Sequence, residues 1–180
     1  MRRIHSFLTL VLILSCALAI KANADNTTDH HEKPHEDLVG AIDKFALLET
    51  PYGSWFKKNH SSYSPDKNSL EALAKTLNGI QVKVFMGTWC HDSQREVPRL
   101  YKILESSNFD LSNLDLVSLN SDKKTPKGLE EGLNIERTPT FIFLRDGVEI
   151  GRIVETPRDS LENDILKIIS GQEYKHSYQQ

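Results

Sequence analysis

The sequence predicts an α/β fold with a central mixed sheet flanked by helices on both faces. Helical and strand-like apolar patterns alternate over residues 68–171. A helix between two of these strands indicates a parallel pair, and Asp146-Gly147 between the last two indicates an antiparallel hairpin. The chain has 180 residues, 38% hydrophobic and 26% charged, which is typical of one globular domain.

Residues 37–67 are expected to form a helical extension on the amino-terminal side of this domain. Apolar side chains recur at helical spacing over residues 38–48. Trp55, Phe56 and Tyr63 follow in a polar stretch, and their large apolar area predicts packing against the main domain.

The first helix and strand of the main domain have clear boundary signals. Asn68 with Glu71 three residues later is typical of a helix N-cap, and Asn78-Gly79 of a helix end. Residues 80–86 then alternate in hydrophobicity with period two, as a strand does. This strand runs directly into Cys90.

The later elements continue the same alternation. Apolar spacing after Cys90 predicts a helix, and Thr156-Pro157 is typical of a cap followed by proline at the first helical position. The remaining expectations are a strand at 114–119, a short helix at 126–133, strands at 140–144 and 148–154, and a last helix from Thr156 that stops at Gly171.

The amino-terminal residues 1–24 are expected to be a secretory signal peptide. Arg2-Arg3 precedes an uncharged, mostly apolar run over residues 7–20, and Ala22-Asn23-Ala24 follows as a small-x-small cleavage site. As a helix the run would span roughly 20 Å, short of a hydrocarbon core of about 30 Å, so no stable membrane span is expected after cleavage. We therefore expect an exported protein, periplasmic or secreted, with lipid attachment at Cys16 as the minor alternative.

Two further segments are polar and are expected to lack regular structure. Residues 25–36 contain three histidines but no large apolar side chain, which predicts a flexible tail. Residues 172–180 form a polar carboxy-terminal tail that is expected to fray.

Cleavage before Asp25 would leave Cys90 as the only cysteine of the mature chain. Cys90 lies where a strand gives way to a helix, so its sulfur meets unpaired main-chain N–H groups and the positive end of the helix dipole. Both features stabilise a thiolate. A protonated His91 would add to this effect, whereas the Asp92 carboxylate would oppose it. The alternative is that Cys90 is a buried, inert core residue.

The sequence around this cysteine resembles the thioredoxin superfamily. The resemblance rests on Trp89-Cys90-His91-Asp92-Ser93, on Pro98, and on Thr138-Pro139 before a strand and hairpin, and it covers residues 68–171. It is nearest to secreted bacterial thioredoxin-like proteins with a tryptophan-cysteine-x-aspartate motif followed by serine or cysteine.

The resemblance implies a role for each of these residues. Cys90 is the attacking cysteine, and Ser93 is expected to be catalytic beside it as a hydrogen-bond donor to the thiolate. Pro98 kinks the helix, and Pro139 is a cis-proline that faces the thiol. The backbone of Thr138 would pair with an extended substrate peptide. Substrate contacts are expected from Trp89, His91, Asp92, Thr138 and Pro139.

Two positions depart from the family pattern. Ser93 stands where a two-cysteine thioredoxin has its resolving thiol, and Val84 stands where thioredoxins carry a buried acid that shuttles protons. Cys90 can therefore form a mixed disulfide but has no internal partner to release it. We expect monothiol exchange with protein thiols or disulfides, completed by an external thiol such as glutathione.

Other functions are weaker alternatives. The main one is a peptide- or protein-binding module that keeps the fold without redox turnover. Cys90 and His91 fall short of the three or four ligands of a metal site, so we expect neither a metal nor a cofactor. The formal charge of −3 gives no basic footprint for a nucleic acid.

Overall fold

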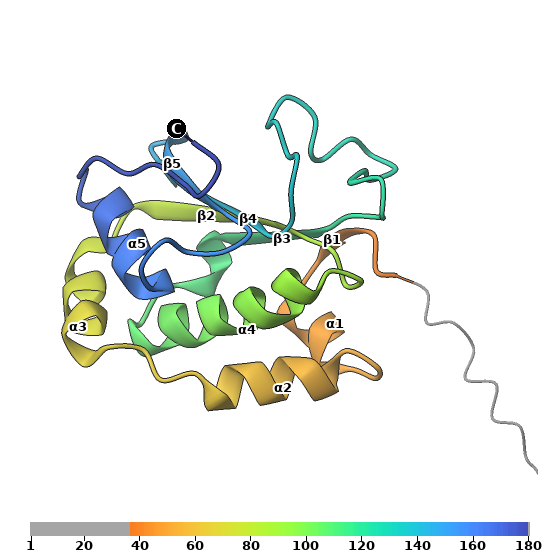
Figure 1. Ribbon diagram of the computed structural model, residues 1–180, viewed down its shortest axis with the longest axis horizontal. Coiled ribbons are helices and arrows are strands. Elements are labelled where there is room, and N and C mark those ends of the chain that lie inside the picture. The colour runs from red at the N-terminus through yellow and green to blue at the C-terminus, as the bar shows by residue number, and fades with distance from the viewer. Residues whose placement is uncertain (1–36, 180) are drawn as a thin grey trace, which may run out of the picture. The chain divides into compact units, whose positions relative to one another are not determined.

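The computed structural model of the protein describes residues 37–179 (Figure 1). The predicted signal peptide and the predicted tail at 25–36 lie outside these residues. The core element is a five-stranded sheet in the order β1-β3-β2-β4-β5, in which β2 and β3 are parallel and the other neighbours antiparallel. The strands are β1 (Gly40–Ile42), β2 (Ile80–Met86), β3 (Leu114–Ser118), β4 (Thr140–Arg145) and β5 (Val148–Val154).

The sheet is mixed and is flanked by helices, as predicted. The helices are α1 (Lys44–Leu48), α2 (Gly53–Ser62), α3 (Lys67–Thr76), α4 (His91–Ser106), the short 3₁₀ helix η1 (Leu111–Asn113) and α5 (Leu161–Ile169). Within residues 37–179, no helix is long and apolar enough to cross a membrane.

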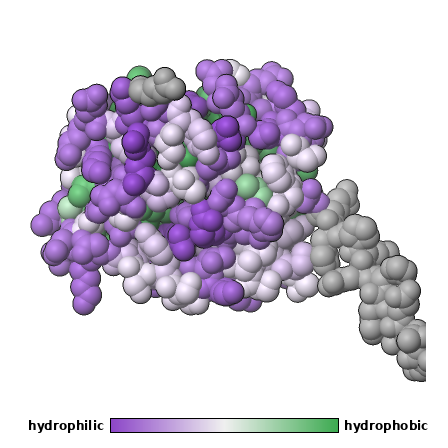
Figure 2. Space-filling model, viewed as in Figure 1, coloured by the Kyte–Doolittle hydropathy of each residue, from purple (hydrophilic) through white to green (hydrophobic). Residues whose placement is uncertain are grey.

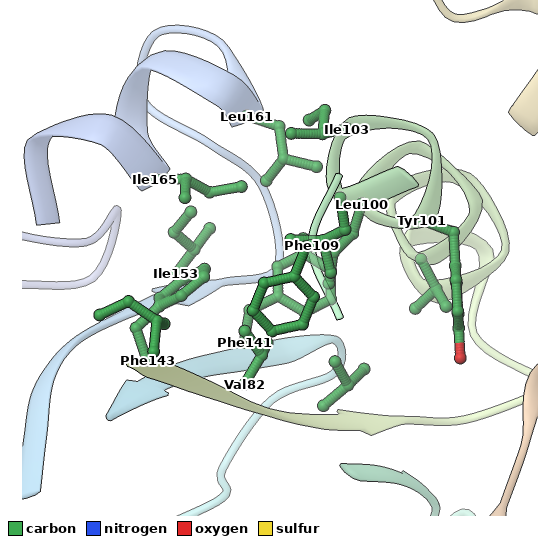
Figure 3. Packing of buried hydrophobic residues seen from close by; sticks show 14 of the residues in the cluster. Val82, Leu100, Tyr101, Ile103, Phe109, Phe141, Phe143, Ile153, Leu161 and Ile165 are labelled. Carbon is green, nitrogen blue, oxygen red and sulfur yellow. The ribbon is translucent and has the colours of Figure 1, made fainter. Parts of the chain in front are cut away.

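The alternation in β2 divides its side chains between two hydrophobic clusters. Ile80, Val82, Val84 and Met86 belong to the main core, whereas Phe85 points to a smaller cluster on the other face. In Figure 3 the sheet residues of the main core lie against α4 and α5, with Val82, Phe141, Phe143, Ile153, Leu100, Ile103, Leu161 and Ile165 labelled. Burying each side chain of this size contributes about 1.5–3 kcal/mol.

The helices gather on one face of the sheet, which corrects the expectation of helices on both faces (Figure 1). The opposite face is covered by the irregular segment 119–139, which supplies Leu133 and Ile135 to the smaller cluster. The short helix predicted at 126–133 is a series of turns. Gly128 and Gly132 have φ of 64° and 74°, outside the helical region.

The helix predicted over residues 38–48 is wrong in its first half. Residues 40–42 instead form β1, which pairs antiparallel with the edge of β3, and α1 begins only after Asp43, whose carboxylate accepts the N–H of Ala46. Apolar residues at 38, 39, 41 and 42 fit either element, and the open edge of β3 decides in favour of a strand. The expected packing of the extension is present, since Phe56 is 1% exposed in the main core.

Two helix starts also differ from prediction. Asp66 rather than Asn68 caps α3, because its carboxylate accepts the N–H of Ser69 at 2.8 Å. The last helix begins after Ser160, not at Thr156, and the Ser160 hydroxyl accepts the N–H of Asn163 at 3.3 Å. The hairpin at Asp146-Gly147 is confirmed, with φ of 51° and 78° at the two positions.

The surface in Figure 2 is mostly hydrophilic, with small separate hydrophobic areas. The exposed large apolar side chains come from different elements: Val39, Phe45, Leu129, Val148 and Tyr178. Scattered residues of this kind are normal on a folded protein.

Candidate functional site

Cys90 occupies the junction between β2 and α4. Its main-chain N–H donates to the carbonyl of Gly87 at 3.0 Å, which closes the turn after the strand. Its own carbonyl accepts the N–H of Gln94 at 2.9 Å, the first hydrogen bond of α4. The side chain is partly exposed and forms no disulfide. The sulfur is therefore accessible at the amino-terminal end of the helix.

Thr138 lies directly against this sulfur. The Cys90 thiol donates a hydrogen bond to the Thr138 carbonyl at 3.1 Å, although the two residues are far apart in sequence. The Thr138-Pro139 peptide is cis, as the resemblance implied, and it precedes β4. The carbonyl of Pro139 accepts the N–H of Glu155 at 2.7 Å, which ties this segment to the end of β5.

Trp89 connects the site to segment 119–139. Its indole N–H donates to the carbonyl of Leu119 at 3.0 Å. The indole also lies over Gly87, where a Cβ atom would come within 2.5 Å of the ring. Glycine at this position is thus required for Trp89 to flank the thiol as it does.

Ser93 and Val84 lie behind the site, in the protein interior. The Ser93 side chain is fully buried, and its hydroxyl accepts the N–H of Gly87 at 3.2 Å. Val84 is also fully buried, among the apolar side chains of the main core. Position 84 therefore presents no titratable group to the thiol.

His91 and Asp92 lie on the first turn of α4. His91 is exposed, whereas the Asp92 carboxylate accepts a hydrogen bond from the Arg95 guanidinium at 2.6 Å. Burial lowers the pKa of the Arg95 guanidinium, but its hydrogen bonds to Glu96 and Asp92 raise that pKa by a larger amount. The net shift is therefore upward. Pairing with Arg95 weakens the repulsion that Asp92 would otherwise exert on a Cys90 thiolate.

A groove of about 520 Å³ opens beside the sulfur. Of the predicted site residues, Trp89, Cys90 and Thr138 line it, and the other lining residues are Ser121, Lys123, Glu136, Arg137 and Glu155. None of these five residues was predicted from the sequence. Of these, only Arg137 could have been found from the sequence, because it directly precedes the predicted Thr138-Pro139 pair. The part of the chain from 37 to 179 contains no cluster of three His, Cys, Asp or Glu residues that could hold a metal ion.

Comparison with known proteins gives related sequences and a related fold. No protein-family model matches the chain. Over 94 residues, 52% of this chain, it is 32% identical to a TPR repeat-containing thioredoxin and 28% identical to thioredoxin H2, both of Arabidopsis thaliana. These matches span 23% and 66% of the two relatives, less than two thirds of either.

A crystal structure of a protein of unknown function from Pseudomonas aeruginosa has a similar fold. The TM-score is 0.52 at 19% identity, and the match covers 74% of this chain and 93% of that one. Part of the sequence is thus similar to plant thioredoxins, and the fold is similar to that of this bacterial protein.

Proposed function

We propose that the protein carries out thiol–disulfide exchange through the single thiol of Cys90. The observation that carries this proposal is the position of the partly exposed sulfur, 3.1 Å from the Thr138 carbonyl in an open groove at the start of α4. The relatives named as thioredoxins support this class of reaction. Their matches cover only part of each protein, so the proposal rests first on the site.

The first step is attack by the Cys90 thiolate on a disulfide of the partner. A new bond forms between Cys90 and one partner sulfur as the partner's S–S bond breaks, and the second partner sulfur leaves as a thiolate that takes up a proton. Cys90 is the N-cap residue of the 16-residue helix α4, so the attack starts at the amino-terminal end of that helix.

The second step needs a thiol from outside the chain. Ser93 occupies the position of a resolving cysteine, and its hydroxyl cannot break a disulfide. An external thiolate, from glutathione or a partner protein, attacks the mixed disulfide, forms a new disulfide with the partner sulfur and releases Cys90 as a thiolate. Val84 supplies no proton for this step, which is consistent with resolution by an outside group.

The partner is a protein or peptide in extended conformation. It would lie in the groove beside Trp89 and Thr138, with its main chain against the segment that ends in the cis-proline. Such an arrangement places the partner disulfide next to Cys90. We also propose export, because residues 1–24 have the pattern of a signal peptide, and disulfides persist in extracytoplasmic compartments.

The replacement Ser93→Cys tests the monothiol mechanism. With an internal resolving thiol, insulin reduction driven by glutathione should rise about ten-fold or more over the unsubstituted chain, because an intramolecular thiol has a high effective concentration. Cys90→Ala, which retains Cys16, is the control and should show only the background rate.

A Ser93→Cys chain that folds but shows no gain in insulin reduction would contradict the monothiol mechanism. If Cys90→Ala also bound a partner peptide as tightly as the unsubstituted chain, the site would instead be a binding groove without redox turnover.

A further inference from the structure

The carboxy-terminal segment 172–179 folds back to the site, although its composition predicts fraying. The hydroxyl of Tyr174 donates to the Asp164 carboxylate at 3.0 Å, and the ring packs against the main core. The hydroxyl of Ser177 donates to the carbonyl of Thr156 at 3.0 Å, just beyond the end of β5. These contacts bring Tyr178 to the residues that follow β5.

Tyr178 holds a pair of charged residues together. The Arg137 guanidinium carbon lies 4.0 Å from the centre of the Tyr178 ring, a cation–π contact, and Arg137 also pairs with Glu155 at 3.4 Å. The Tyr178 hydroxyl donates to the same Glu155 carboxylate. The ring and hydroxyl of one side chain therefore fix both members of the ion pair.

This cluster adjoins the groove beside Cys90. Arg137 and Glu155 line that groove, and Arg137 also lines a second hollow of about 280 Å³ together with Tyr178. A main-chain hydrogen bond links the same two segments, since the N–H of Glu155 donates to the Pro139 carbonyl. Tyr178 thus contacts the residue before Thr138 without lining the groove itself.

We propose that Tyr178 is a positioning residue that holds the segment 137–139 ready for an extended peptide partner of Cys90. The inference rests on the proposed exchange reaction and adds to it a requirement for the carboxy-terminal segment. Without the Tyr178 side chain, Arg137 and Glu155 keep their ion pair but lose the ring and the hydroxyl that fix it, so a bound peptide must restrict both side chains further. Ordering one or two such side chains on binding lowers peptide affinity, but a small reagent that touches only the sulfur avoids this cost.

The test compares two reactions of Cys90 in the full chain. One is alkylation by iodoacetamide. The other is exchange with a ten-residue peptide whose cysteine carries a 2-thiopyridyl disulfide, and its rate is measured from the pyridinethione that leaves. Peptide mapping by mass spectrometry assigns both products to Cys90 rather than Cys16. In Tyr178→Ala we expect the rate constant with the peptide to fall about five-fold while that with iodoacetamide stays within about two-fold.

Tyr178→Phe is the matched variant, because it keeps the ring over Arg137 and removes only the hydroxyl. It should retain at least about half of the rate with the peptide. An unchanged peptide rate in Tyr178→Ala, or an equal loss with both reagents, would overturn the inference while leaving the exchange reaction intact. A chain without substitutions that reacts with iodoacetamide but not with the peptide disulfide would instead overturn the proposed function, and the inference with it.

Discussion

The chemistry of Cys90 depends on a few atoms around its sulfur. The Thr138 carbonyl lies in front of it at 3.1 Å, and Ser93 lies behind it, fully buried, with its hydroxyl bound to the N–H of Gly87. Ser93 therefore stabilises the turn between β2 and α4. A resolving cysteine at this position would serve in catalysis, whereas the serine serves in holding the turn.

Ser93→Ala should destabilise the protein without disabling the thiol. The replacement removes a buried acceptor from the Gly87 N–H, which costs about 1–3 kcal/mol in the free energy of unfolding. Urea unfolding measures this loss, and the rate of Cys90 alkylation by iodoacetamide in the folded chain should stay within about two-fold of its original value. A large fall in alkylation with little loss of stability would instead make the Ser93 hydroxyl a direct partner of the thiolate.

The motif residues of the site could be predicted from sequence because they lie in local patterns. The strand before Cys90, the helix after it and the Thr138-Pro139 pair each have a short-range signal. Lys123, Glu155 and Tyr178 have none. Lys123 reaches the groove through the irregular segment 119–139, Glu155 through the end of β5, and Tyr178 comes beside it through the carboxy-terminal residues. These positions depend on contacts between distant parts of the chain.

At the scale of helices and strands, the prediction succeeded where packing and local preference agree. In β2 the alternation matches burial on both faces, and the Asp146-Gly147 hairpin needs no distant partner. It failed where two local choices were similar in energy. The segment 40–42 became a strand because β3 offered an open edge, and that edge is a property of the sheet rather than of the segment.

The helix starts illustrate the same limit. Asp66 and Asn68 are both good N-cap residues, and the structure uses the first. Thr156-Pro157 has the local pattern of a helix start, yet Ser160 caps α5 and the buried Asp164 carboxylate accepts the N–H of Arg158 in the connection before it. The start of α5 is thus fixed by a cap at Ser160 and by a hydrogen bond from the preceding connection to the helix, rather than by proline in the first turn.

At the scale of the whole described molecule, Glu105 ties the amino-terminal helices to α4. Its carboxylate accepts hydrogen bonds from Lys44 of α1 and from His60 of α2, the latter at 2.8 Å. Burial raises the pKa of Glu105, but the hydrogen bonds from Lys44 and His60 outweigh it and hold the pKa below its ordinary value. Protonation of Glu105 would weaken both contacts.

This arrangement predicts a loss of stability in acid. Because the pKa of Glu105 is lower in the folded state, its contribution is fully present above the unfolded value of about 4.3 and is lost as the pH falls through the folded value. Glu105→Gln should be less stable than the original chain at pH 7, by on the order of 1 kcal/mol for a partly exposed pair. The difference should shrink steadily below about pH 4 in urea unfolding.

Asp115→Asn is the matched control for this prediction. Its carboxylate pairs with Lys83 at 3.2 Å on the surface, where the Asp115 side chain is 66% exposed. Its effect on stability at pH 7 should be within about 0.5 kcal/mol. A difference between Glu105→Gln and the original chain that persists unchanged to pH 3 would show that the ionised carboxylate does not hold the helices in place.

In the proposed reaction Cys90 attacks a disulfide, and its release depends on a thiol from outside the chain. The decisive measurement is intact-mass spectrometry of the full, reduced chain incubated with oxidised glutathione, with peptide mapping to separate Cys90 from Cys16. We expect one glutathione adduct on Cys90, which is stable until reduced glutathione is added in excess and is then lost. If Cys90 in the folded chain stays unmodified while a free cysteine peptide in the same tube reacts, Cys90 does not carry out this exchange.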